Sequence, residues 1–127
     1  MSDQILRLAN AAWQVRKNAR LIGTTAVGCA VLSDSGAIWS GCNIEHQFRS
    51  HDIHAEVNAI GNMISGGEKR LRIVLIAAQR ERFSPCGACL DWIFEFADPE
   101  CRVIWQGQPG GPLNSKYVRE LMPFYPK

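Results

Sequence analysis

The sequence predicts an α/β protein, a three-layer α/β/α sandwich with a central mixed sheet. Segments with helical spacing of apolar residues alternate along the chain with short apolar runs. One such run, residues 72–78, is almost wholly apolar, which is typical of a strand covered on both faces. Alternation of this kind predicts strands that share one sheet, with helices packed against it.

The first predicted element is a helix over residues 3–19, where apolar residues recur every three or four positions. Apolar runs over residues 26–32 and 37–42 follow, separated by a Ser-Asp-Ser-Gly segment. Because serine, aspartate and glycine favour turns, this pattern predicts two strands joined by a tight turn.

The middle of the chain predicts a second helix over residues 54–64, closed by a Gly-Gly pair, and then the strand over residues 72–78. A third helix is expected with Ser84 as its N-cap and Pro85 at its first helical position, because these residue types favour those positions. It should end near Ala97.

The last elements are less sharply patterned. Residues 102–105 predict a strand, and residues 114–121 fit either a strand or a helix. A Gly/Pro-rich loop lies between them, too near the end to separate two domains.

Length and composition indicate one globular domain spanning residues 1–127. Apolar residues make up 46% of the chain and charged residues 20%, which argues against disorder. The 14 basic and 12 acidic side chains give a net charge of +2, too weak to predict a nucleic-acid or membrane partner by charge alone.

Five cysteines are the unusual count, and an odd number cannot all pair within one chain. The N-terminal residues do not resemble a secretory signal, and no run approaches the roughly 20 apolar residues of a membrane span. We therefore expect a cytoplasmic protein, in which neighbouring cysteines are more often metal ligands or catalytic groups than disulfides.

Two short segments carry the chemistry: residues 54–56, His-Ala-Glu, and residues 85–89, Pro-Cys-Gly-Ala-Cys. Each falls at the predicted start of a helix. Cys86 and Cys89, three residues apart on a first turn, can reach one ion together, and His54 supplies a third ligand. Imidazole nitrogen and thiolate sulfur are the ligands that zinc prefers.

Three protein ligands leave a fourth zinc position open to water, which is typical of a catalytic site. Two thiolates and a neutral imidazole also balance the charge of Zn²⁺. We expect the positive end of the third helix to favour the thiolate forms of Cys86 and Cys89. A structural zinc site, or buried cysteines without a metal, is the alternative.

Glu56 lies two residues from His54 and is not needed as a ligand. A carboxylate there can take a proton from zinc-bound water and return it to a substrate nitrogen. Zinc brings the pKa of its bound water toward 7, so this chemistry can run at neutral pH.

The H-x-E and P-C-x-x-C segments together form the signature of zinc-dependent deaminases, and the chain resembles the cytidine deaminase family. The resemblance covers most of the chain. It is carried by residues 26–32 (Ala-Val-Gly-Cys-Ala-Val-Leu), 41–45 (Gly-Cys-Asn-Ile-Glu), 84–89 (Ser-Pro-Cys-Gly-Ala-Cys) and 120–123 (Glu-Leu-Met-Pro). The Asn-x-Glu element is typical of family members that act on free nucleosides.

The resemblance implies one Zn²⁺ per subunit, and it also implies residue roles. Asn43 and Glu45 would hydrogen-bond the ribose hydroxyls, although Asn43 also suits a plain turn residue. Ala55 would contact the pyrimidine through its backbone. The Ser84 carbonyl would lie near the leaving amine, and Phe124 would cover the site of a neighbouring subunit in a homo-oligomer. A tetramer is favoured, with a dimer as the alternative.

The chain departs from the short form of the family at the metal. That form usually has cysteine at the position of His54 and arginine at the position of Val57. The two differences agree, since replacing a thiolate by imidazole removes the negative charge that the arginine would offset. The His-Ala-Glu form is commoner in the family's longer, two-domain dimers.

Other departures concern the substrate. Thr25 replaces a usual aromatic residue, Arg49 replaces a tyrosine, and Leu90-Asp91 replaces Arg-Gln. Arg49 near the pocket would favour an anionic or bulkier substrate, or it is a solvated loop residue.

We therefore predict zinc-dependent hydrolytic deamination of cytidine or deoxycytidine to the uracil nucleoside and ammonia. The first alternative is a modified cytidine or a cytosine nucleoside antibiotic such as blasticidin S. The second, from another class, is a zinc-stabilised binding module without turnover. A base within a polynucleotide is disfavoured because the chain has no long basic track.

Overall fold

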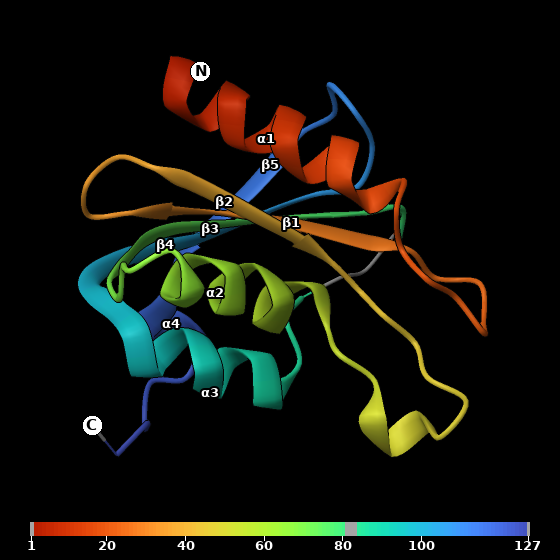
Figure 1. Ribbon diagram of the computed structural model, residues 1–127. Helices are drawn as coiled ribbons and strands as arrows, with labels where there is room; N and C mark the ends of the chain where they lie inside the picture. Colours follow the sequence, from red (N-terminus) through yellow and green to blue (C-terminus); the bar gives the residue numbers. More distant parts are fainter. Residues whose placement is uncertain (1, 81–83, 127) are drawn as a thin grey trace.

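A mixed five-stranded sheet with the order β2-β1-β3-β4-β5 lies at the centre of the computed structural model, which describes residues 2–80 and 84–126 (Figure 1). Among the described strands β3 and β4 run parallel, and each other neighbouring pair is antiparallel. The strands are β1 (Val27–Ser33), β2 (Ile38–Cys42), β3 (Leu71–Ala78), β4 (Ala97–Gln106) and β5 (Leu113–Tyr117).

Helices cover both faces of the sheet, so the predicted three-layer α/β/α sandwich is confirmed (Figure 1). Helix α1 (Asp3–Arg16) packs on one face. The opposite face carries α2 (Ala55–Ser65), α3 (Gly87–Phe96) and the short α4 (Val118–Leu121). No helix in the described part of the chain is long and apolar enough to cross a membrane.

The central strands are buried on both faces because their side chains alternate between two apolar clusters. On β1, Cys29 and Val31 join the cluster under α2 and α3, whereas Ala30 and Leu32 join the cluster under α1. Cys29 and Cys42 are buried on their strands.

Apart from the start of α3 and shifts of one residue, the structure differs from the sequence-based predictions in three places. Helix α1 ends at Arg16, because the chain then turns so that Arg20 pairs with the backbone of Asn43 and Glu45. Strand β4 is longer than the predicted 102–105: it begins at Ala97, which pairs with β3, and ends at Gln106, which pairs with both β3 and β5. Residues 114–121 divide between strand β5 and helix α4.

The position of α2 is set by a close approach to β2. Gly41 on β2 has no room for a side chain, because a Cβ there would overlap the backbone of Asn58 and Ala59. The Asn58 side chain accepts a hydrogen bond from the Cys42 backbone N–H at 3.0 Å. These contacts fix the helix whose N-terminal end carries the histidine and glutamate of the motif.

Candidate active site

The two motif segments meet at one end of the helical layer. Helices α2 and α3 lie side by side with their N-terminal ends on the same side (Figure 1). His54 is the N-cap residue of α2, Cys86 is the N-cap residue of α3, and Cys89 lies in the first turn of α3.

The three predicted ligands form a compact donor set. His54 Nδ1 lies 3.2 Å from Cys89 Sγ and 3.4 Å from Cys86 Sγ. All three ligand atoms lie within 4.8 Å of one another. Tetrahedral zinc with ordinary bond lengths separates its nitrogen and sulfur ligands by about 3.5 Å, so the donor set fits this metal in both chemistry and spacing.

The start of α3 differs from the expectation. Ser84 is not the N-cap and Pro85 does not occupy the first helical position, because the helix begins at Gly87. Cys86 takes the cap position, and its Sγ accepts a hydrogen bond from the Cys89 backbone N–H at 3.4 Å. The Cys86 sulfur therefore serves both as the helix cap and as a candidate metal ligand. The general preference for serine at N-cap positions does not predict this role for a cysteine.

Glu56 lies beside the donor set, within hydrogen-bond reach of Cys89, and is only 3% exposed. Burial raises its pKa, while hydrogen bonds from its own backbone N–H and from Cys89 act in the opposite direction. A carboxyl group with a raised pKa beside a metal site suits a group that both takes and returns a proton near neutral pH.

The expected stabilisation of both thiolates by the α3 N-terminus is wrong for Cys89. Burial, followed by the charge of Glu56, raises the pKa of the Cys89 thiol well above its ordinary value. In this buried position desolvation outweighs the helix end. Deprotonation of Cys89 therefore depends on the metal, which removes the proton of a coordinating thiol.

A cavity of about 240 Å³ opens beside the donor set. It brings together segments from β1, the 43–53 loop, α2 and the residues before α3. Eight of the predicted site residues line it: Asn43, Glu45, Arg49, His54, Ala55, Glu56, Ser84 and Cys86. Phe124 lies outside this cavity and is 96% exposed.

Asn43 and Glu45 are both held firmly at one side of the cavity. The Asn43 side chain accepts from Val27 N at 2.9 Å and donates to Thr25 O at 2.8 Å. Glu45 Oε1 accepts from the backbone N–H groups of Ile22 and Gly23, both at 2.7 Å. These two bonds are the main reason that the pKa of Glu45 is lowered.

Arg49 lies on the one-turn 3₁₀-helix Arg49–His51 and is engaged by two carboxylates. Its Nη2 lies 3.2 Å from Glu45 Oε2, and its Nε lies 2.8 Å from Asp52 Oδ2. Asp52 also accepts from His46 N, and that bond, followed by Arg49, lowers its pKa. Asp52 lines the cavity, although the sequence pattern did not predict it as a site residue. An aspartate in a loop has no local sequence pattern that would indicate its contact with Arg49.

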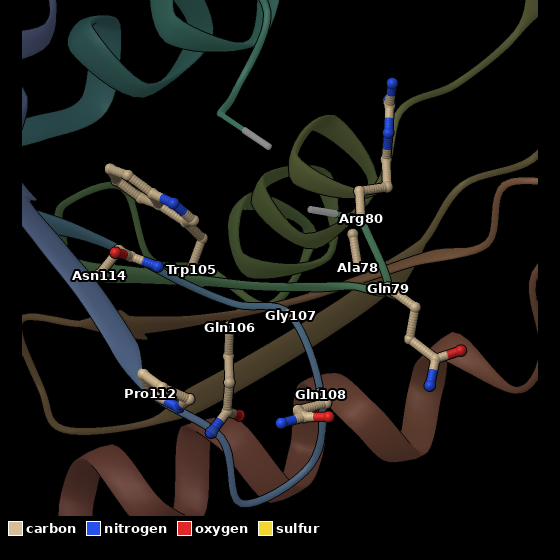
Figure 2. A pocket seen from close by; sticks show the side chains of 9 residues that line it. All are labelled: Ala78, Gln79, Arg80, Trp105, Gln106, Gly107, Gln108, Pro112 and Asn114. Carbon is tan, nitrogen blue, oxygen red and sulfur yellow. The ribbon is translucent and has the colours of Figure 1, made fainter. Parts of the chain in front are cut away.

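Arg80 is a second residue that sequence reasoning missed. It lines the 240 Å³ cavity and also a neighbouring cavity of about 510 Å³ beyond the ends of β3 and β4 (Figure 2). In Figure 2 its side chain extends away from Gln106 and Gln108. No other described residue forms a salt bridge with it. Its position after a parallel strand was the available signal, since ligands gather at the carboxyl ends of such strands.

Comparison with known proteins decides the family. A family model for the cytidine and deoxycytidylate deaminase zinc-binding region matches residues 2–105. The chain belongs to this family. The cytidine deaminase of Sporosarcina psychrophila is 34% identical over 98 residues, covering 76% of this chain and 71% of that protein. The blasticidin-S deaminase of Bacillus cereus is 31% identical over 108 residues, covering 76% and 74%.

The fold of this deaminase-family chain also matches solved structures. The cytidine deaminase from Burkholderia pseudomallei superposes with a TM-score of 0.85 at 22% identity, covering 98% of each chain. At that identity the likeness concerns the fold. Family membership makes the chain a hydrolytic deaminase by class, and zinc is the metal that its His-Cys-Cys set is positioned to bind.

Proposed function

We propose that this chain deaminates a free cytosine nucleoside, converting cytidine or deoxycytidine to the uracil nucleoside and ammonia. One observation carries the proposal: two of the three candidate metal ligands (His54 and Cys86), the buried Glu56 and the Asn43–Glu45 pair all border one 240 Å³ cavity, and Cys89 lies with the two ligands. One small substrate in this cavity can therefore reach the metal site, the proton-transferring carboxyl group and the polar groups that would bind its sugar.

The cavity offers a polar end for the sugar. Glu45 Oε1 accepts from two N–H donors, whereas Oε2 meets only Arg49 among the described residues and has lone-pair capacity left for a substrate hydroxyl. Asn43 uses one amide hydrogen on Thr25 and retains the other. We assign these two groups to the ribose, and the backbone at Ala55 and the Ser84 carbonyl to the pyrimidine.

Glu56 moves the protons of the reaction. His54, Cys86 and Cys89 would hold a zinc ion, which would act as a Lewis acid and bring the pKa of water toward 7. Glu56 takes one proton from that water and delivers it to N3 of the ring as the water oxygen bonds to C4. The C4–N bond then breaks, and the amino group leaves as ammonia with the second proton.

Replacement of Glu56 by glutamine tests this assignment. We expect Glu56→Gln to lower kcat for cytidine by about 100-fold or more, because general acid–base catalysis typically contributes that much. The measurement is ammonia release under steady-state conditions, with zinc content determined on the same samples. Near wild-type turnover by the variant would exclude Glu56 as the proton carrier.

Treatment with a chelator separates the enzyme from the zinc-stabilised binding module. We expect turnover to cease without zinc and to return when zinc is restored. A zinc-loaded, folded wild-type protein that releases no ammonia from any cytosine nucleoside would favour the binding module instead.

A bulkier cytosine nucleoside is the second candidate substrate. It is favoured by the similarity to a blasticidin-S deaminase. It is also favoured by Arg80, which lines both the 240 Å³ cavity, called the nucleoside cavity below, and the 510 Å³ cavity beside it. A screen of cytidine, deoxycytidine, substituted cytidines and blasticidin S discriminates the candidates by kcat/KM. Preference for unmodified cytidine would reject this second candidate.

A further inference from the structure

The Arg49 guanidinium lies between two carboxylates at the sugar end of the nucleoside cavity. It contacts Glu45 Oε2 at 3.2 Å and Asp52 Oδ2 at 2.8 Å. Arginine presents several donors in a rigid plane, so it can hold both carboxylates in defined positions at once. Its charge is thereby matched within the protein rather than left for an anionic substrate.

These contacts complete the immobilisation of Glu45. The loop before β1 holds Oε1 through Ile22 N and Gly23 N, and Arg49 holds Oε2 from the opposite loop. Arg20 adds a bond from its Nη1 to the Glu45 carbonyl at 2.9 Å. The carboxylate therefore has little rotational freedom left to lose when a substrate hydroxyl arrives.

Asp52 fixes the other side of Arg49. Its Oδ1 accepts from His46 N at 2.7 Å, while its Oδ2 meets Arg49. Asp52, which directly follows the 3₁₀-helix, thus ties His46 before the helix to Arg49 at its first position. Among the described residues, no hydrogen bond or salt bridge joins Asp52 directly to Glu45. Arg49 is the residue that links the two carboxylates.

We propose that Arg49 and Asp52 are positioning residues, forming a clamp that fixes the Glu45 carboxylate for one sugar hydroxyl of the nucleoside. The clamp rests on the proposed nucleoside deaminase function and makes it more specific. Preorganisation of a binding group lowers the ordering cost of binding. Loss of the clamp should therefore raise KM for substrates that carry the hydroxyl and leave kcat nearly unchanged.

The primary experiment compares cytidine with 2′,3′-dideoxycytidine, which lacks the hydroxyls that Glu45 would bind. We expect Arg49→Met to raise KM for cytidine by about five-fold, the scale of a lost partly exposed ion pair. KM for the dideoxy substrate should stay within about two-fold of wild type on the same grounds. Arg49→Lys should recover part of the loss, and Asp52→Asn should shift KM in the same direction as Arg49→Met.

Arg70→Met is the matched control. Arg70 is 55% exposed against 53% for Arg49, and it also lies beside two carboxylates, those of Asp34 and Asp98. It does not line the nucleoside cavity. Its replacement should change neither KM nor kcat.

A double-mutant cycle separates positioning from direct contact with substrate. We expect Arg49→Met to add nothing to the KM of Glu45→Ala, because the clamp acts only through that carboxylate. An equal loss on both substrates, or an undiminished effect in the Glu45→Ala background, would overturn the clamp while leaving the deaminase function intact. A wild-type protein with no activity on any cytosine nucleoside would overturn both.

Discussion

The Cys89 thiol is well placed to bind a metal ion, but its environment disfavours the thiolate form when no metal is bound. Its position on the first turn of α3 aims the thiol at His54, yet burial and the neighbouring Glu56 carboxylate raise its pKa. The same desolvation that makes a free thiolate costly strengthens the interaction between a thiolate and a cation. The site is thus chemically complete only when the metal is bound.

A pH dependence of zinc binding follows. Because the Cys89 thiol is protonated at neutral pH, zinc uptake should release at least about one proton per ion. For each proton released, affinity should fall about ten-fold per unit decrease in pH. Calorimetric titration in buffers of different ionisation enthalpy measures this release, and a heat independent of the buffer would contradict it.

At the scale of elements, the site depends on how closely α2 approaches β2. Helical periodicity predicts α2 nearly to its ends, but periodicity does not say where a helix sits on a sheet. Gly41 sets that distance, because only a residue without a side chain fits against Asn58 and Ala59. His54 and Glu56 are carried on the end of the helix that this contact fixes.

Substitution of Gly41 tests this dependence. We expect Gly41→Ala to lower the free energy of unfolding by about 1–3 kcal/mol through overpacking, and to lower kcat by displacing α2. Gly61→Ala is the control: this glycine lies within α2 and has open space at its Cβ position. It should be neutral or stabilising by up to about 1 kcal/mol. Denaturant unfolding and ammonia release measure both, and equal effects of the two substitutions would refute the close-contact explanation.

At the scale of the whole molecule, the C-terminal segment packs against α3 through Tyr125, whereas the side chain of the neighbouring Phe124 is exposed. Tyr125 stacks on Phe94 with 4.4 Å between ring centroids and donates a hydrogen bond to Asp91. Phe124, beside it, is 96% exposed. Large exposed aromatic side chains are enriched at interfaces between proteins. This arrangement supports the proposal that Phe124 covers the site of a second copy of the chain.

Light scattering tests assembly directly. We expect a mass well above the 14.1 kDa of one chain, with a tetramer favoured. Phe124→Ala should weaken association and lower kcat/KM about ten-fold, the scale of a lost interface anchor. Leu6→Ala, at another exposed apolar residue, should do neither. A fully active 14.1 kDa particle would exclude the shared site.

Local chemistry determined most of what could be predicted from the sequence. Apolar periodicity predicts the order of helices and strands, because burial of apolar side chains repeats with the geometry of each element. Ligand chemistry and spacing predict His54, Cys86 and Cys89, because few residue types bind zinc and two of them share one helical turn. The sequence could therefore be assigned both an α/β sandwich and a metal site.

Long-range contacts decided the rest. Asp52 and Arg80 enter the cavity only through loops whose paths depend on the finished sheet. The extension of β4 to Gln106 follows from its pairing with β3 and β5 rather than from local propensity. The raised pKa of Cys89 reflects burial, which no single segment specifies. Burial and through-space charge are properties of the packed chain, so tertiary structure alone set the electrostatics of the site and the clamp on Glu45.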